Sequence, residues 1–532
     1  MSYEPILGID LGTTFSAMAW VDAEGQARIL PNREGHVLTP SVFHFPDART
    51  CVVGEQALRM VVADAPHVVR FVKRAIGVEG RTFTVHGQVR SPQEISSFLL
   101  RKFKQDAESA LGRAVDSCVI SVPAYFNAAQ RGATQEAGIL AGFDVRSIVN
   151  EPTAAAIAWG VERLGGERKL LVFDLGGGTF DVTLMEMKGS TLTMLASDGN
   201  TELGGKDWDD RLVARVASRV REITGEPLPD LEGSPELYER CVAAKLQLSS
   251  RPRTVVPVRV GRRQVSVPLT REEFEQATHD LVAQCTDTCA VMLDRAGHTW
   301  ADVDDILPAG GSTRMPMVQD ALRRVSGKPI VAGLNPDACV ALGAAHCAVF
   351  RHQPDHPAIA AWRDALAGTP REGMRGLSNE TGSGPTDSGP APVAVHDIAT
   401  HPLGAVVLDA EGNERILGIL PASVPLPAER RVRFAYAWDG MTSVTVEVTE
   451  GAGDTRAEVT VIGTVVLEDL PPRPRGTPID VIYRYAHDGT LEVAVVDVQT
   501  SAETRARIEL HGQLEGEHFA EVRLRVRDVE LR

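Results

Sequence analysis

Residues 6–16 read Ile-Leu-Gly-Ile-Asp-Leu-Gly-Thr-Thr-Phe-Ser, an apolar run that ends at Asp10 and passes into a turn of one glycine and two threonines. Such a turn exposes backbone N–H groups and hydroxyls that hold phosphate oxygens, and the aspartate can orient a water bound to Mg²⁺. A second apolar run, residues 170–173, leads into Asp-Leu-Gly-Gly-Gly-Thr-Phe-Asp at residues 174–181. Two such turns predict a duplicated domain whose two hairpins grip the phosphates of one nucleotide from opposite sides.

A third glycine-rich stretch, residues 307–316, contains Gly310, Gly311 and Ser312. Adjacent glycines let the backbone approach a flat ligand closely. A single Asp-Gly-Thr turn or a single Gly-Gly-Ser is usually only a turn or a loop. All three stretches in this order, with Glu-Pro-Thr at residues 151–153 between them, indicate one common site.

Length and charge restrict the class of protein. The chain has 532 residues, 43% of them apolar, whereas single hydrophobic cores stop growing near ~250–300 residues, so two or more domains follow. The net charge of -16 repels nucleic-acid backbones and anionic lipid surfaces. We therefore expect neither nucleic acid nor membrane as a partner.

Cysteine usage and the N-terminal residues indicate a cytoplasmic protein. The seven cysteines are scattered without a CxxC pair, which favours reduced, buried thiols over a disulfide framework or a zinc site. The first residues show no basic region followed by a long apolar stretch, and no run reaches the ~18 apolar residues needed to span a bilayer.

The character of the chain changes along its length. Short β-branched runs alternate with amphipathic stretches over residues 1–352, which predicts a layered α/β domain. Residues 353–392 become dominated by Gly, Ser, Thr, Asn and Pro, which predicts a flexible linker. Alternation with period two then predicts an all-β sandwich of about eight strands over residues 393–512. The same alternation predicts one extra strand over residues 513–532, with no helical lid.

Together these motifs resemble the actin, sugar-kinase and heat-shock chaperone superfamily. Residues 8–16 are similar to its chaperone branch, the heat-shock protein 70 family of DnaK-like molecular chaperones. The resemblance covers residues 5 to about 350, through matches at residues 122–127, 150–156 and 335–337, and continues more loosely at residues 401–404, 474–476 and 488–489. It implies an actin-like ATPase domain of duplicated ribonuclease-H-like subdomains, followed by a β-sandwich similar to a peptide-binding domain.

The resemblance implies a full set of catalytic and metal-binding residues. Asp10, Asp174 and Asp181 match the aspartates that hold Mg²⁺ through water. Lys73 matches the lysine that hydrogen-bonds the attacking water, and Glu151 matches the glutamate that positions water and metal. The set also suits phosphoryl transfer on chemical grounds, because that reaction needs an oriented water, charge neutralisation and N–H donors.

The resemblance further implies how the cofactor, ATP or ADP, is bound. Its phosphates would be held by small and hydroxyl side chains of the two hairpins: Gly12, Thr13, Thr14, Gly176, Gly177, Gly178 and the catalytic Thr179. Its purine and ribose would be held by Lys245, Ser249, Gly310, Gly311, Ser312, Arg314 and Asp337.

The predicted helix around Lys245 departs from the family pattern. Leu246 stands where the family has an arginine that stacks on adenine, and Val242 stands where it has a glutamate. Loss of a cation–π stack worth roughly 0.5–2 kcal/mol weakens nucleotide affinity by about tenfold and leaves the hydrolysis chemistry intact. Residues 75–91 and 223–239 are shorter than is typical, which leaves recognition by a nucleotide-exchange factor open.

Two features bear on coupling between the domains. Pro123 and Arg131 match the coupling proline and arginine of the family, although a strand-ending proline and a solvated helix arginine explain them equally well. Residues 393–397 replace a leucine-rich run. Burying fewer methylenes, each worth ~0.8 kcal/mol, predicts weaker docking of this segment on the ATPase domain.

Five positions of the sandwich match the lining of the family's peptide cleft: Phe434, Ala437, Val444, Val446 and Ile479. Alternating apolar residues fill a sandwich core equally well, so the pattern leaves cleft and core open. A cleft would bind an extended polypeptide through main-chain hydrogen bonds and one apolar pocket. Without a lid, such a peptide would exchange fast.

We therefore predict an ATP hydrolase of the chaperone type that binds unfolded polypeptide clients in protein folding and the stress response. The resemblance implies a J-domain co-chaperone as a further partner. The alternative is a nucleotide-dependent regulatory protein with one dedicated partner and slow turnover, which the linker and Leu246 favour. A metabolite kinase is disfavoured, because the sandwich and the chaperone-branch motifs argue against it. A filament-forming actin relative is disfavoured, because the sequence offers no polymer interface that differs from ordinary surface.

The departure at Leu246 gives a prediction. Leu246→Arg should tighten nucleotide binding by about tenfold, because it restores the stacking cation. Titration calorimetry with ADP measures the change directly. An unchanged or weaker affinity would contradict the stacking argument.

Overall fold

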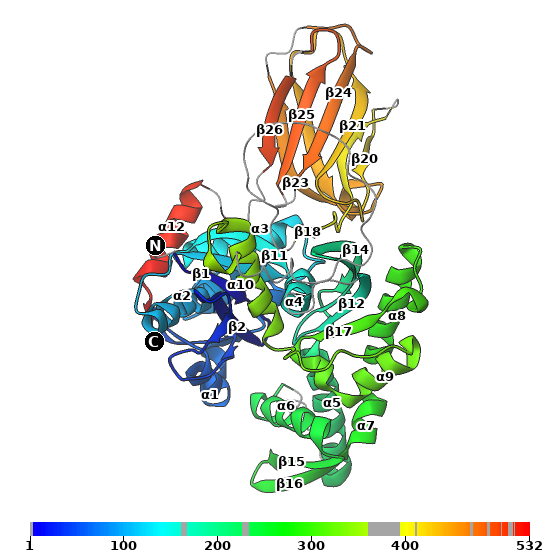
Figure 1. Cartoon of the computed structure of the whole chain (residues 1–532). Helices are drawn as coiled ribbons and strands as arrows, with labels where there is room; N and C mark the ends of the chain where they lie inside the picture. Colours follow the sequence, from blue (N-terminus) through cyan, green and yellow to red (C-terminus); the bar gives the residue numbers. More distant parts are fainter. Residues whose placement is uncertain are drawn as a thin grey trace.

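The computed structural model has a β-domain standing on a larger α/β body (Figure 1). The structure describes residues 4–160, 167–225, 233–359, 394–409, 412–468, 472–486, 490–501, 503–508, 514 and 516–532. Most of the expected linker, residues 360–392, lies outside the described residues.

The first part of the α/β body, which we call lobe I (residues 4–150), is built around the hairpin quoted first. The main sheet has the strand order β11-β10-β1-β2-β3, and β4 pairs with β2. β1 runs antiparallel to β2 and parallel to β10. The strands of this sheet are β1 Ile6–Asp10, β2 Phe15–Val21, β3 Ala27–Leu30, β4 Thr39–Pro40, β10 Ser117–Val122 and β11 Asp144–Asn150.

Smaller sheets and three helices complete lobe I. These strands are β5 Val42–Asp47, β6 Thr50–Val53, β7 Val68–Arg70, β8 Phe83–Val85 and β9 Gln88–Arg90, and the helices are α1 Glu55–Ala63, α2 Pro92–Leu111 and α3 Ala128–Leu140. Local signals set the ends of α2: Ser91 Oγ accepts from Glu94 N at 3.2 Å, and Gly112 ends the helix with φ 64°.

The second part of the body, lobe II (residues 167–330), contains the second hairpin. Its main sheet has the order β17-β12-β13-β14-β18, in which β18 is Ala394–His396. β12 is antiparallel to β13 and parallel to β17. The elements are β12 Glu167–Leu175, β13 Phe180–Lys188, β14 Thr191–Asn200, α5 Gly205–Thr224, α6 Pro235–Ser250, β15 Arg253–Val260, β16 Arg263–Thr270, α7 Arg271–Ala277, α8 His279–Arg295, β17 Asp305–Ala309 and α9 Pro316–Ser326. Within the described ranges, every helix is too short or too polar to cross a bilayer.

Two apolar helices, α4 Glu151–Gly160 and α10 Cys339–His352, pack against one another beside the two main sheets. Their contact depends on glycine, because a Cβ atom at Gly343 would lie 1.7 Å from the carbonyl oxygen of Ala154. The close approach of α10 to β1 has the same cause: a Cβ atom at Gly8 would lie 2.1 Å from the backbone N of Ala345.

The β-domain is a sandwich of two four-stranded sheets, ordered β20-β19-β22-β23 and β21-β24-β25-β26. Val448, Val481 and Val493 are among the buried side chains of its core. The strands are β19 Leu403–Leu408, β20 Glu414–Leu420, β21 Ala428–Ala435, β22 Val444–Glu450, β23 Thr460–Leu467, β24 Pro478–Tyr485, β25 Leu491–Asp497 and β26 Glu503–Ile508.

The prediction of one extra C-terminal strand over residues 513–532 is wrong for most of that range. A helix, α12 Gly516–Asp528, is followed by the short strand β27 Glu530–Leu531. Val522 and Val526 are buried while Leu524 between them is 53% exposed. Valines at i and i+4 satisfy a helical face as well as period-two alternation, so the pattern was ambiguous.

The first residues of the range predicted to be the sandwich belong to lobe II. β18 Ala394–His396 pairs parallel with β14 at Thr191–Thr193 and so extends the lobe II sheet. Asp397 accepts a hydrogen bond from Thr153 Oγ1 at 3.0 Å. The sandwich strands therefore begin after this docked segment, and not at residue 393.

The packing of α10 gives a prediction. Gly343→Ala should lower the apparent melting temperature by about 5 °C, because the methyl group forces α4 and α10 apart, although alanine is the better helix former. Differential scanning fluorimetry measures it. The matched control is Gly160→Ala on α4, where a Cβ atom would meet only Met187 Sδ at 3.7 Å. Equal melting temperatures for both variants would contradict the argument.

Candidate nucleotide-binding site

The two Asp-Gly-Thr hairpins face each other and touch where the two lobes meet, and we call this junction, with the residues around it, the nucleotide cleft. A Cβ atom at Gly177 would lie 2.2 Å from Oγ1 of Thr14, and one at Gly178 would lie 2.5 Å from Oγ1 of Thr13. Only glycine fits at these two positions, because a methyl group would overlap the opposite loop. The structure thus brings the predicted phosphate-binding loops together.

Lys73 and Glu151 form a buried ion pair at the floor of this cleft. Lys73 Nζ lies 2.5 Å from Glu151 Oε1, and each side chain is 7% exposed. Burial by itself lowers the pKa of Lys73, but the carboxylates of Glu151 and Asp10 outweigh it and raise the pKa above its ordinary value. The ammonium therefore stays charged inside the protein.

Three buried aspartates surround the ion pair. Burial, followed by the charge of Glu151, raises the pKa of Asp10 to about 7 and the pKa of Asp181 to about 7. The pKa of Asp174 is raised well above its ordinary value by burial and then by Glu151 and Asp181. Crowded, desolvated carboxylates of this kind favour a cation between them.

The carboxylates do not form a direct metal cage. No group of three or more His, Cys, Asp or Glu side chains in the described ranges is arranged to ligate a metal ion. Asp10 accepts from Ser121 Oγ at 3.5 Å, and Asp181 accepts from Tyr125 N at 3.2 Å.

The residues predicted to hold purine and ribose lie around the second hairpin. Ser312 Oγ donates to Gly176 O at 2.8 Å, and Lys245 Nζ donates to Gly205 O at 2.7 Å. Arg314 pairs with Asp337 at 2.7 Å. These contacts connect α6, the loop before α9 and the turn before α10 at one side of the cleft.

Glycine is again required where the loop before α9 meets the second hairpin. Gly310 has φ 76°, and a Cβ atom there would lie 2.6 Å from Asp174 Oδ1. Ser249 Oγ donates to Lys245 O within its own helix at 3.1 Å, and Leu246 is 65% exposed. The structure therefore gathers Gly310, Lys245 and Ser312 with the hairpin, while Leu246 faces solvent.

Sequence reasoning missed Arg74. Its Nε donates to Gly178 O at 2.8 Å, and its Nη2 lies 2.5 Å from Asp207 Oδ2. Asp207 in turn accepts from Gly204 N at 2.7 Å at the start of α5. Arg74 thus fixes the second hairpin from lobe I, and its position beside Lys73 was the only signal in the sequence.

Arg131 is not a solvated helix residue. Its guanidinium donates to Ala124 O at 2.9 Å and to Asn150 Oδ1 at 2.6 Å. Pro123 is buried, and Arg131 therefore ties the loop that follows it to the end of β11, directly before Glu151. The solvated alternative raised by the sequence does not hold.

The sandwich contacts the loop that Arg131 fixes. His401 Nε2 lies 2.9 Å from Tyr125 O, and Glu450 Oε2 accepts from Ala128 N at 2.8 Å. Glu450 is buried at the N-terminus of α3, and this burial raises its pKa. These partners are distant in sequence, so no local pattern could have predicted them.

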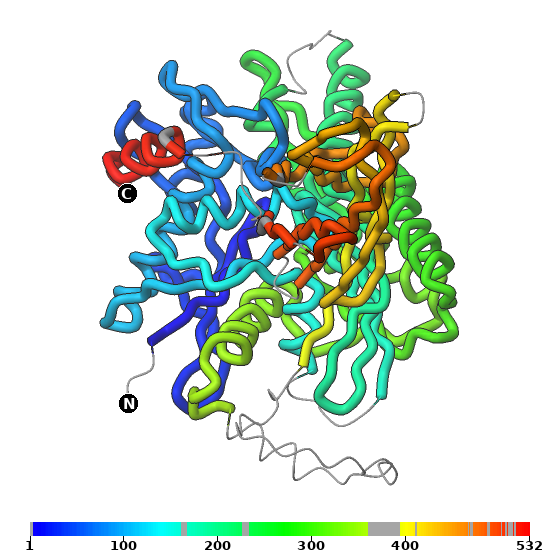
Figure 2. The backbone as a smooth tube through the Cα atoms, turned by 90° about the horizontal axis from the view of Figure 1, so that it is seen from above, coloured from blue at the N-terminus to red at the C-terminus, as the bar shows by residue number. Residues whose placement is uncertain are grey.

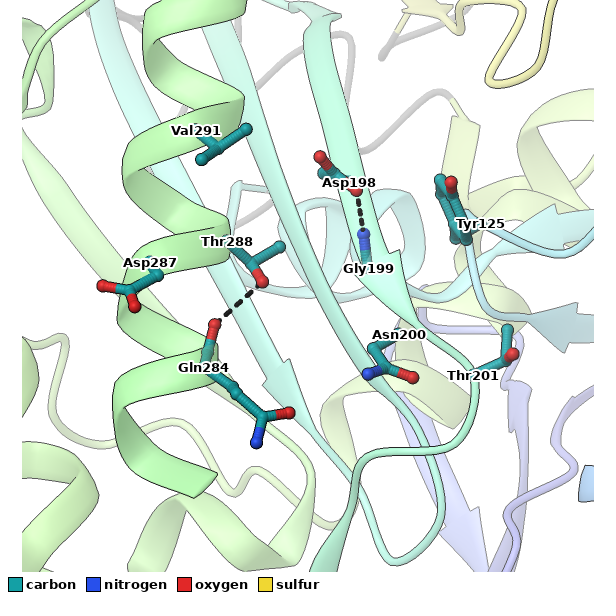
Figure 3. Close-up of a pocket in the computed structure, with 9 residues that line it drawn as sticks. All are labelled: Tyr125, Asp198, Gly199, Asn200, Thr201, Gln284, Asp287, Thr288 and Val291. Carbon is teal, nitrogen blue, oxygen red and sulfur yellow. Dashed lines mark hydrogen bonds between the residues drawn. The ribbon is translucent and has the colours of Figure 1, made fainter. Parts of the chain in front are cut away.

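A pocket of about 440 Å³ lies beside Tyr125, between the end of β14 and α8 (Figure 3). Its walls include Asp198, Asn200 and Thr288, and none of its lining residues belongs to the predicted nucleotide set. The pocket therefore lies outside the predicted nucleotide set, although the backbone of Tyr125 contacts Asp181.

The predicted peptide-cleft residues divide between core and margin. Val446 and Ile479 are buried in the sandwich core. Phe434 and Val444 are partly buried, and Ala437 is exposed.

Hairpins of this kind in two lobes, joined to a β-sandwich, define an ATPase with an attached β-domain. The model of the Hsp70 protein family matches residues 6–358 and 393–529, and the chain belongs to this family. It is an ATP-dependent molecular chaperone and an ATP hydrolase.

Similar curated proteins agree with this assignment. The chaperone protein DnaK of Thermosipho melanesiensis is 35% identical over 508 residues, which is 94% of this chain and 79% of that protein. DnaK of Thermosipho africanus is 36% identical over 508 residues with the same coverage. DnaK of Thermotoga neapolitana is 35% identical over 514 residues, again 94% and 79%.

The raised pKa of Asp181 predicts a pH dependence of stability. An acid whose folded-state pKa is about 7, against an ordinary 3.8, binds more protons when folded, so the ligand-free protein loses stability as pH rises from about 4 to 7. Asp181→Asn removes this contribution and should raise stability at pH 7.5 by on the order of 1–3 kcal/mol.

Urea unfolding from pH 5 to 7.5 measures the effect. Asp294→Asn, at an exposed position on α8, is the control, and its free energy of unfolding should fall with pH as steeply as that of the parental protein. If the free energy of Asp181→Asn falls equally steeply, the Asp181 carboxyl group is not the cause of the pH dependence.

Proposed function

We propose that this chain hydrolyses Mg-ATP between the two facing hairpins and couples hydrolysis to the binding of extended polypeptide segments by the sandwich. The observation that carries the proposal is the buried Lys73–Glu151 pair among three carboxylates with raised pKa. Phosphoryl transfer requires such a set, in which fixed charges and an oriented water do most of the work.

The chain's own residues have distinct tasks in this reaction. The hairpin N–H groups and the hydroxyls of Thr13, Thr14 and Thr179 donate to the phosphates. Glu151 accepts a hydrogen bond from the attacking water, and Lys73 holds that water in line and balances the charge of the γ-phosphoryl group.

Asp10, Asp174 and Asp181 would hold Mg²⁺ through water. The fit is supported by their burial and their mutual repulsion, which a cation relieves. When bound, Mg²⁺ neutralises charge on the β- and γ-phosphates.

The two main sheets support a duplicated, ribonuclease-H-like origin of the lobes. In lobe I, the strands β3-β2-β1 are antiparallel and β10 joins β1 in parallel; in lobe II, β14-β13-β12 are antiparallel and β17 joins β12 in parallel. The equivalent turns, after β1 and after β12, are the phosphate hairpins. The first residues of the expected linker belong to the ATPase body, because Ala358 and Ile359 are buried in one core cluster with residues of β2 and α10. We propose residues 1–359 as the ATPase domain, the rest of the predicted linker up to residue 392 as the connection, and a sandwich that ends by residue 512.

The sandwich is the proposed site for unfolded or extended polypeptide. Main-chain pairing with an edge and an apolar pocket would hold such a segment, with Phe434, Ala437 and Val444 at its margin. The docked β18 strand and the Glu450 and His401 contacts are the proposed route of coupling, together with Pro123 and Arg131. A J-domain co-chaperone and a nucleotide-exchange factor are further proposed partners.

A dedicated-partner protein with slow turnover is the second candidate. The burial of Val446 and Ile479 in the core favours it, because it leaves fewer apolar side chains for a general peptide cleft. Hydrolysis measured with a set of unrelated apolar peptides separates the two: stimulation by several supports the chaperone, and indifference to all supports the dedicated partner.

The site gives a prediction for Lys73. Lys73→Ala should reduce ATP turnover at least ~100-fold, because the attacking water loses its cationic donor, while ADP affinity stays within about threefold. Single-turnover hydrolysis and calorimetry measure the two effects.

The control is Lys188→Ala, at an exposed position on β13 that pairs only with Glu167 and Glu186 among the described residues. It should hydrolyse ATP at the parental rate. Parental turnover in Lys73→Ala itself would remove Lys73 from the mechanism.

A further inference from the structure

The C-terminal segment, residues 514–532, lies on lobe I and away from the sandwich that precedes it. Figures 1 and 2 show α12 beside α2 at the edge of the α/β body. Val522, Val526 and Val529 are buried in the same core as Phe98 and Leu99 of α2. The segment therefore contributes to the hydrophobic core of lobe I.

A buried ion pair fixes α12 to α2. Arg525 Nε donates to Glu94 Oε1 at 3.0 Å, and Arg525 Nη2 pairs with the other oxygen of the same carboxylate. The Glu94 side chain is fully buried and also pairs with Arg90. Arg525 therefore gives a fully buried carboxylate a second guanidinium partner, and this partner comes from α12.

The end of the helix is capped from lobe I. Arg101 donates from Nη1 to Val526 O at 2.6 Å and from Nη2 to Val529 O at 2.5 Å. An arginine that bonds the last carbonyls of a helix satisfies groups that have no partner within it. At the start of the segment, Leu514 N donates to Glu136 Oε1 at 3.1 Å.

The last strand extends a sheet of lobe I. β27 pairs parallel with β6, in the strand order β27-β6-β5-β7. Glu530 N donates to Arg49 O at 2.8 Å, and Arg532 N donates to Cys51 O at 2.9 Å. This pairing covers the edge of β6.

Only a short stretch of chain connects the sandwich to the C-terminal segment on lobe I. The sandwich ends at Ile508, and Leu514 is already on lobe I, so six residue steps join them. Six extended residues span at most ~20 Å. At its other end the sandwich is attached to lobe II through β18.

We propose that residues 514–532 are a tether that occupies a dedicated binding site on α2, α3 and β6 of lobe I and keeps the sandwich beside the ATPase domain in every nucleotide state. If β18 and the Glu450 contact release, the short connection still holds the sandwich within ~20 Å of lobe I, at a high effective concentration. The two domains rearrange without separating. The tether lies outside the nucleotide cleft, so it stands or falls independently of the proposed catalytic roles.

Cleavage of the full chain tests the tether. A protease site placed within residues 509–513 leaves every contact described above in place. Small-angle scattering should give the uncut chain the same maximum dimension with ATP and with ADP, and the cut chain a larger one with ADP. Equal dimensions for cut and uncut chains in both nucleotides would overturn the proposal.

The same cut protein also tests whether lobe I has a binding site for residues 514–532. The fragment from residue 514 onward should elute with the remaining chain on size exclusion. Its elution as a free peptide would show that lobe I has no site for it, and would overturn the proposal equally.

A substitution then tests the ion pair. Arg525→Glu opposes the buried Glu94 and should speed hydrogen exchange of the α12 amides at least tenfold in the uncut chain. The control is Arg523→Glu, at an exposed position two residues earlier on the same helix, and it should leave the exchange of these amides unchanged. Similar exchange in both variants would remove Arg525 as the anchor.

Discussion

The structure of the ATPase domain depends on one crowded set of charges. One ammonium, Lys73, is buried with the carboxyl groups of Glu151, Asp10, Asp174 and Asp181. The aspartates respond with raised pKa, so the ligand-free cleft lacks positive charge. The proposed metal–nucleotide complex would correct that shortage. The ends of β1 and β12, the start of β13 and the first turn of α4 each bring one carboxyl group to the same point, which is why both lobes are needed.

The hairpins could be predicted from sequence because each is local: an apolar strand, an aspartate and a glycine turn follow one another within about ten residues. The sandwich strands near residues 444–450 and 478–485 were predictable for the same reason, since one buried face imposes period-two alternation. α12 was not, because valines four residues apart fit both periods and only the lobe I core decides between them. Contacts such as Arg74 with Asp207 join residues 133 positions apart, which no local pattern reports.

The sandwich is attached to the ATPase domain through both of its ends and through its side. β18 adds to the sheet of lobe II, the C-terminal segment adds to lobe I, and Glu450 and His401 contact the loop before α3. A rotation of one lobe against the other must therefore change the strain on the sandwich, because its attachments follow different lobes. Weak docking, which the short apolar side chains of residues 393–397 suggested, is offset by main-chain pairing that does not depend on side-chain size.

A continuous set of contacts connects the sandwich to the catalytic pair. Glu450 accepts from the first turn of α3, Arg131 on α3 donates to Asn150, and Asn150 precedes Glu151 in the chain. α3 is a helix of 13 residues with a capping box at Asn127, so its first turn cannot shift without carrying Arg131 with it. Displacing Glu450 removes a buried carboxylate from a helix N-terminus, where it is stabilised by the helix dipole. The energy of that contact is thus available to bias the position of Glu151, and through it the water that we propose Lys73 and Glu151 align.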